Sequence, residues 1–324
     1  MDSPVRSRLP ALTSRLRAFT RRRRTLLTVV GPLVTAAVLA FVLAGRRDEF
    51  AAALGDAAAW VLVVTVLLQI VALLSRSEAW HLSIQAAGGT VARRVLYRAS
   101  SMAVLGSLVN GQVGVAARIA ALRRSSPTVS PHVPTLIAAE FPILAVEATL
   151  AALTSFTLVG PLGLPWWLPL IGLVVVGTAS AGLRHLALRK GRELWRGLAI
   201  ARSLRGGSRL IGFVLVAVLA QIARNWLLLD AVGVDASLFD AIAVLIAVVS
   251  LAQLPVGPSV GAAAAVLILG SDGVAAAAAA GVLMTVTGTV GGLCFAGWAG
   301  ADRLWSGSRR AALRRTGARA GRSR

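Results

Sequence analysis

The chain consists of apolar blocks of about twenty residues separated by short basic segments, and this pattern limits its possible folds more than any other feature. About twenty apolar residues in a helix cross a hydrocarbon core about 30 Å thick. Of the 324 residues, 56% are hydrophobic and 15% are charged, whereas soluble domains carry about 25% charged residues. The pattern excludes a soluble enzyme and a disordered chain, and it predicts an all-α, multi-pass integral membrane protein.

Six blocks are long enough to be predicted as membrane crossings. They are residues 25–44, 57–75, 135–159, 168–188, 210–229 and 275–300. The first block follows a run of arginines, so it is either an uncleaved anchor or, as the alternative, a cleaved signal peptide. We expect three parts along the chain: a basic N-terminal tail at 1–24, a transmembrane domain at 25–305 and a basic C-terminal tail at 306–324.

Basic residues are concentrated beside the predicted crossings. Of the 34 lysines and arginines, 31 lie in five clusters, and the net charge is +21. Lysine and arginine are enriched in cytoplasmic loops, and six crossings place both termini on the same side. We therefore expect cytoplasmic termini in the bacterial plasma membrane, with membrane lipids as partners, especially anionic phospholipid headgroups. No nucleic-acid recognition module accompanies the charge, so nucleic acid is not expected as a partner.

Two further apolar segments have helix-breaking centres. Residues 99–122 carry arginines at both ends and the sequence Asn110-Gly111-Gln112-Val113-Gly114 in the middle, while residues 241–269 are interrupted by proline and glycine at 255–261. Proline and glycine break helices, and non-helical backbone at membrane depth is tolerated only where protein buries it or where it lines a wet cavity. We predict two re-entrant helical hairpins with a polar groove between them, the first hairpin entering from the cytoplasm and the second from outside.

The surroundings of these two segments resemble each other, because several residues recur at an offset of 145 or 146. The pairs are Trp80 and Trp226, Gly88 and Gly233, and Gly111 and Gly257. The predicted topology gives the two halves, about 57–159 and 210–300, opposite orientations. Such inverted repeats are common in transporters, where broken helices form the transport site near the bilayer midplane. The alternative is a chance match between alanine- and glycine-rich sequences.

Ionisable residues inside membrane spans mark functional sites by default. Arg118 lies in the returning arm of the first hairpin, where it would bind phosphate or, as the alternative, reach to the cytoplasmic interface. Arg224, with Asn225 beside it, lies deep in the crossing 210–229. The alternative for Arg224 is an ion pair with Asp230.

Glu140 and Glu147 are seven residues apart on the crossing 135–159, so their carboxylates point in the same direction. They would serve as counter-ions for the arginines, bind a cationic headgroup or form a proton relay. Two carboxylates on one face are also the minimum for acid–base catalysis, but no nucleophile–base pair or metal-ligand cluster accompanies them. We therefore expect no enzyme activity, no metal and no organic cofactor.

Several short motifs resemble those of a known family. They are Asn110, Gly114 and Arg118 followed by Glu140, and Arg224 followed by Leu254, Pro255, Pro258 and Gly261. Together they resemble the transmembrane, flippase-like region of the lysylphosphatidylglycerol synthases, in its stand-alone form without the synthase domain. The resemblance covers about residues 25–305. In bifunctional members, this region moves aminoacylated phospholipid between leaflets.

The resemblance implies a transporter that moves a phospholipid or lipid-linked headgroup between leaflets. The alternatives are a non-transporting membrane scaffold for a glycosyltransferase or lipid-modifying enzyme, and an integral-membrane enzyme acting on a lipid-linked substrate. Substrate-binding residues are expected at the two helix breaks and on the charged spans. They are Asn110, Gly111, Gly114, Arg118, Glu140, Glu147, Arg224, Asn225, Pro255, Gly257 and Gly261.

Overall fold

A computed structural model describes most of the chain and shows helices as its only regular structure over the described residues. The described residues are 34, 36–41, 43–107, 111–125, 132–188, 198, 200, 203–252 and 259–320, without the side chains of 111–112, 186–188, 271–272 and 302–320. Five helices are long and apolar enough to cross a membrane. They are Ala59–Ala86, Val133–Leu162, Leu168–His185, Leu204–Ala231 and Gly273–Ala301. Five of the six predicted spans therefore coincide with helices that could cross a membrane, and the sixth, 25–44, lies mostly outside the described residues.

Two long helices, α3 (Ala59–Ala86) and α11 (Leu204–Ala231), pack along each other at the centre of the helix bundle. Each has 28 residues. The C-terminal part of α3 shares a core cluster with the N-terminal part of α11. Further along, Ala72 packs with Ala217 and Ala220, and Gln69 of α3 hydrogen-bonds to Arg224 of α11. Residue numbers therefore fall along α3 as they rise along α11, so the two helices are antiparallel.

Both helices end in the same way. Gly88 follows α3 with a φ of 85°, and Gly233 follows α11 with a φ of 78°. This left-handed conformation suits glycine because it has no side chain. The next backbone N–H groups, those of Gly89 and Val234, donate to the carbonyl oxygens of Ile84 and Leu229 and so satisfy helix-terminal acceptors.

The first predicted hairpin is two short packed helices, α4 (Arg93–Ser107) and α5 (Gly111–Ser125). Each has 15 residues and is therefore about 22 Å long, which is too short to cross a bilayer alone. Gly106 and Gly114 allow the close approach of the two backbones, since a Cβ atom on Gly106 would lie 2.9 Å from the Gly114 Cα. The segment predicted as a helix break was 110–114, but residues 111–114 are the first turn of α5.

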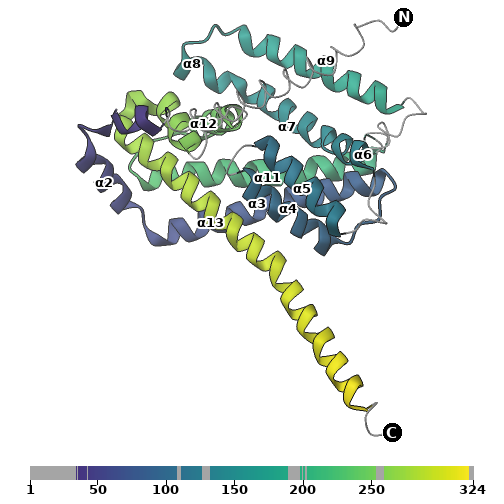
Figure 1. Ribbon diagram of the computed structural model, residues 1–324. Coiled ribbons are helices and arrows are strands. Elements are labelled where there is room, and N and C mark those ends of the chain that lie inside the picture. The colour runs from purple at the N-terminus through teal and green to yellow at the C-terminus, as the bar shows by residue number, and fades with distance from the viewer. Residues whose placement is uncertain are drawn as a thin grey trace, which may run out of the picture.

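The second predicted hairpin also contains two short helices. α12 (Leu238–Leu251) begins with a capping box, in which Ser237 and Asp240 exchange hydrogen bonds. The second arm is Val260–Gly270, the start of α13 (Val260–Ala320). Gly273, with a φ of 139°, interrupts α13 and separates this arm from the long span that follows. Beyond that span, α13 leaves the bundle and continues as a helix through most of the predicted basic tail (Figure 1).

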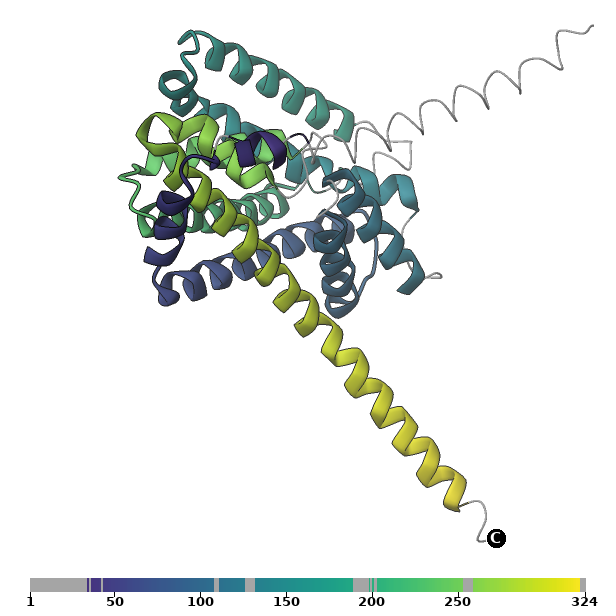
Figure 2. The ribbon, with the colours of Figure 1, turned by 60° about the vertical axis from the view of Figure 1, so that its left-hand side comes forward.

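The remaining helices lie around this centre. α6 (Val133–Ala138), α7 (Phe141–Thr154), η1 (Ser155–Leu158) and α8 (Val159–Leu162) form one interrupted span, and α9 (Leu168–Leu188) packs beside α7 (Figure 1). The first interruption of this span falls at Ala139–Glu140, two residues before Pro142. Proline explains it, because its ring and its missing N–H break or kink a helix. α2 (Arg47–Asp56) packs against α13, on the side of the bundle away from the projecting end of that helix (Figure 2).

The same order of helices occurs twice along the chain. A 28-residue helix, a left-handed glycine, two short helices and a long span follow one another from α3 to α8, and again from α11 to the long part of α13. The predicted repeat requires this order, and the antiparallel packing of α3 and α11 is the relation that inversion of one half would produce.

Candidate functional site

A buried ion pair joins the first hairpin to the following span. The Arg118 guanidinium of α5 donates through Nη2 to the carboxylate of Glu140, and each of the two side chains is 6% exposed. The indole ring of Trp80, which is fully buried on α3, lies 4.1 Å from the guanidinium carbon of Arg118. The alternative in which Arg118 reaches out to the interface is therefore wrong.

A second ion pair lies seven residues further along the span that contains Glu140. Arg76 of α3 donates through Nη2 to Glu147 of α7 at 3.0 Å, and the two side chains are 41% and 24% exposed. The prediction that Glu140 and Glu147 face the same direction agrees with their positions beside neighbouring arginines. Of the roles left open for the two carboxylates, the structure favours that of counter-ions for arginine.

Arg224 differs from the other two arginines because its described partners are neutral. Its Nη1 donates to the side-chain oxygen of Gln69, and its Nη2 donates to the carbonyl oxygen of Met284 at 3.4 Å. Its Nε is buried and has no hydrogen-bond partner. Among the described side chains no carboxylate forms an ion pair with Arg224, so the predicted alternative of a pair with Asp230 is wrong.

Glycines of α13 make room for this contact. A Cβ atom on Gly288 would lie 3.3 Å from Nη1 of Arg224, and one on Gly291 would lie 2.8 Å from the Cγ of Gln69. The absence of side chains here allows α3, α11 and α13 to meet around one guanidinium.

One face of α3 connects the two regions. Gln69, Arg76 and Trp80 are spaced by seven and four residues, so they lie on the same side of the helix. Gln69 hydrogen-bonds to Arg224. Arg76 pairs with Glu147, and Trp80 packs on the guanidinium of Arg118. Seven residues correspond to about 10 Å along the helix axis. Sequence reasoning did not identify these three residues as part of a site, although the helical spacing of polar residues in an apolar span was a usable signal.

A further polar group fixes α4 against α3 and α13. Tyr97 of α4 donates to the carboxylate of Glu78, which also pairs with Arg93 at 3.5 Å. The Tyr97 ring packs against Phe295 and Trp298 of α13, at centroid distances of 6.3 and 5.6 Å. Tyr97 therefore anchors α4 to both α3 and α13.

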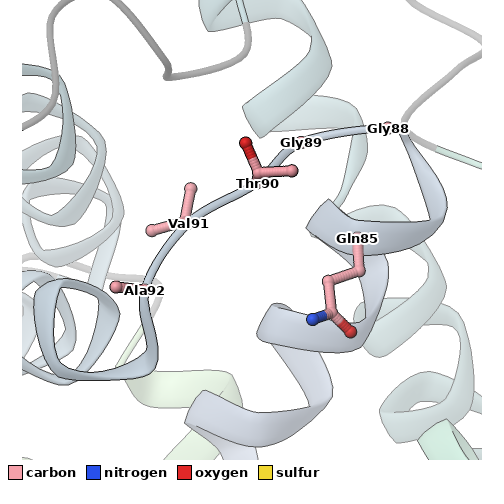
Figure 3. A pocket seen from close by; sticks show the side chains of 6 residues that line it. All are labelled: Gln85, Gly88, Gly89, Thr90, Val91 and Ala92. Atoms are coloured by element: carbon pink, nitrogen blue, oxygen red, sulfur yellow. The ribbon is translucent and has the colours of Figure 1, made fainter.

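A surface pocket of about 500 Å³ opens at the corner between α3 and α4 (Figure 3). It is lined by Gln85, Gly88, Gly89, Thr90, Val91 and Ala92. None of the predicted site residues lines this pocket. The polar groove predicted between the two hairpins stays a prediction, because 108–110 and 253–258 lie outside the described residues.

The other predicted site residues divide into four groups. Asn110, Pro255 and Gly257 lie outside the described residues, and Gly111 begins α5. Gly114 and Gly261 are packing positions, because a Cβ atom there would lie 2.7 Å from the Ala103 carbonyl oxygen and 2.5 Å from the Gly281 carbonyl oxygen, respectively. Asn225 is 2% exposed, and its side-chain oxygen has no partner. Over the described part of the chain, His, Cys, Asp and Glu side chains form no group of three or more that could hold a metal.

Comparisons with known proteins do not assign the chain to a family. No protein-family model matches it, and no curated protein is significantly similar to it. Its own structure shows apolar helices compatible with a multi-pass membrane protein. Of the three arginines described above, Arg76 and Arg118 pair with carboxylates, whereas the described partners of Arg224 are neutral.

Proposed function

We propose that this protein is a flippase-like transporter, which moves a phospholipid or lipid-linked headgroup between the leaflets of the bacterial plasma membrane. The observation that supports this proposal best is the guanidinium of Arg224, which lies inside an apolar helix bundle with only neutral partners. A lipid phosphate would supply the missing negative charge.

The energetic argument concerns a charge at membrane depth. An arginine at the centre of a membrane helix costs about 2.5–3.5 kcal/mol on insertion scales, so such residues face the bundle interior and mark substrate or ion pathways. The guanidinium of Arg224 retains an Nε donor without a partner. Arginine binds phosphate through two parallel hydrogen bonds, and these charge-assisted bonds are roughly twice as strong as neutral ones. Arg224 is therefore the residue we assign to the headgroup phosphate.

The proposed topology has six crossings and two re-entrant hairpins in an inverted repeat, with both termini in the cytoplasm. The short lengths of α4, α5, α12 and the first arm of α13 support hairpins that enter the membrane without crossing it. The antiparallel packing of α3 and α11 supports inversion. The distribution of basic residues supports the orientation.

Arg118 takes a different role in this proposal from the one its sequence suggested. Since Glu140 already neutralises it, Arg118 holds α5 against the following span, and Arg224 binds the phosphate. A relationship to the flippase-like region of the lysylphosphatidylglycerol synthases is part of the proposal, and the motifs around Arg118 and Arg224 support it.

Reconstitution into lipid vesicles tests this function. Vesicles containing a trace phospholipid with a fluorescent acyl chain are treated with dithionite, which bleaches only the outer leaflet unless lipid moves across the bilayer. The wild-type protein is expected to expose nearly all of the label, whereas Arg224→Gln is expected to slow the movement by roughly tenfold or more, because loss of a charge-assisted contact is worth about 1.5–3 kcal/mol.

Arg209→Gln is the matched control, because Arg209 is an exposed residue at the start of the same helix. This variant removes the same charge and is expected to move lipid at the wild-type rate. Folding of each variant is checked by gel filtration in detergent. Wild-type vesicles that protect half of the label, as protein-free vesicles do, would refute transport.

A further inference from the structure

We infer that the transported headgroup is net anionic and carries no amine, as in a phosphodiester lipid with a hydroxylated headgroup. This inference rests on the proposed function and names the substrate class of the same site. It depends on which charges of the bundle interior have partners and which have none.

Among the described residues, the spans hold three carboxylates that are buried or partly buried, Glu78, Glu140 and Glu147, and all three are occupied. Glu78 accepts a hydrogen bond from Tyr97 and pairs with Arg93. Glu140 pairs with Arg118 and Glu147 pairs with Arg76. The Glu140 side chain is 6% exposed, so releasing it to an amine would leave the equally buried Arg118 without a counter-ion. Breaking one side of a buried ion pair is strongly unfavourable. A headgroup amine therefore finds no free carboxylate among the described interior side chains.

The remaining interior charge is positive. Arg224 contacts only the oxygens of Gln69 and Met284, and its Nε has no partner. Arg76 and Arg118 are neutralised by their carboxylates, whereas the charge of Arg224 has no carboxylate partner among the described side chains. An anionic phosphate neutralises it, whereas an ammonium group close to the guanidinium would be repelled, and a like-charge contact in a poorly solvated site opposes binding strongly.

Gln69 and Gly288 set how closely a headgroup approaches. Gln69 holds one edge of the guanidinium through Nη1, and Gly288 leaves the backbone of α13 without a side chain beside the same nitrogen. The guanidinium plane is therefore fixed by α3 and α13 before a ligand arrives. A fixed donor set discriminates by charge without rearrangement.

Three lipids with the same fluorescent acyl chain test this inference in phosphatidylcholine vesicles. They are phosphatidylglycerol with a charge of −1, zwitterionic phosphatidylethanolamine and the cationic lysyl ester of phosphatidylglycerol. The wild-type protein is expected to move phosphatidylglycerol at least about tenfold faster than either amine-bearing lipid. The preference is expected to persist at about 1 M salt, where surface charges are screened within about 3 Å but the interior guanidinium is not.

The variants separate this site from the basic surface of the protein. In Arg224→Gln the preference for phosphatidylglycerol is expected to disappear, whereas in Arg209→Gln it is expected to remain. Equal wild-type rates for the three lipids, or faster movement of an amine-bearing lipid, would overturn the inference and leave lipid transport intact. A preference that survives in Arg224→Gln would also overturn it. Failure to move any of the lipids refutes the proposed function itself, and the wild-type comparison decides the question even if Arg224→Gln does not fold.

Discussion

Replacing Glu140 with glutamine is expected to destabilise the protein by about 3–5 kcal/mol, because it leaves the Arg118 guanidinium buried without a counter-ion. Trp80 would still face the guanidinium carbon, but a cation–π contact provides only about 2 kcal/mol even in a desolvated site. The Nε of Arg118 already lacks a partner, so no spare acceptor offsets the loss. Unfolding in mixed detergent micelles, followed by circular dichroism, measures the change.

Two further variants isolate the cause of this effect. Glu147→Gln makes the same chemical change in the same span, but its pair with Arg76 is partly exposed, so the expected loss is below about 1 kcal/mol. Replacing both members of the buried pair, Arg118→Met with Glu140→Leu, is expected to restore most of the stability, since apolar pairs often substitute for buried ion pairs at no net cost. Equal losses in Glu140→Gln and Glu147→Gln would contradict the assigned burial.

Replacing Gly281 with alanine is expected to be the other strongly destabilising change. A Cβ atom on Gly281 would overlap the backbone of Ala262, and one on Gly261 would lie 2.5 Å from the carbonyl oxygen of Gly281. Because the colliding atoms belong to the backbone, no side-chain rotation relieves the overlap. Separating the helices is expected to cost about 3 kcal/mol, the upper part of the usual range for overpacking.

Gly297 provides the control on the same helix. A Cβ atom there meets nothing within 4 Å, so Gly297→Ala is expected to stabilise α13 by up to about 1 kcal/mol through helix propensity. Thermal unfolding of the two variants in the same detergent compares them directly. A Gly281→Ala protein as stable as Gly297→Ala would show that the arm at 260–270 does not pack closely on the following span.

Hydropathy predicted the membrane helices well and missed features that depend on distant contacts. The predicted crossing 168–188 coincides with α9. The helix of the crossing predicted to end at residue 75 continues to Ala86, because Arg76 finds a counter-ion in Glu147 and Trp80 is buried. A charged residue ends an apolar run in a hydropathy profile, but it does not end a helix when another element supplies a partner.

The site residues also divide into those set by local helix geometry, which could be predicted, and those set by contacts between distant parts of the chain, which could not. The seven-residue spacing of Glu140 and Glu147 gave their common direction, because that is a local property of a helix. The role of counter-ion for an arginine was among the expectations, but the pairing of Glu147 with Arg76 and the contact of Gln69 with Arg224 could not be predicted, since these residues are 71 and 155 positions apart in the sequence. The difference between a neutralised Arg118 and an unbalanced Arg224 depends entirely on such pairs.

Transport across the bilayer requires the two helix breaks to be reachable from opposite sides of the membrane, and single-cysteine labelling measures this directly. The variants Gln112→Cys and Pro258→Cys are made in a Cys294→Ala background, which removes the one native cysteine. A membrane-impermeant maleimide is expected to label position 112 from the cytoplasmic side only and position 258 from the outer side only. Labelling of both positions from the same side would contradict the inverted hairpins and the transport mechanism that depends on them.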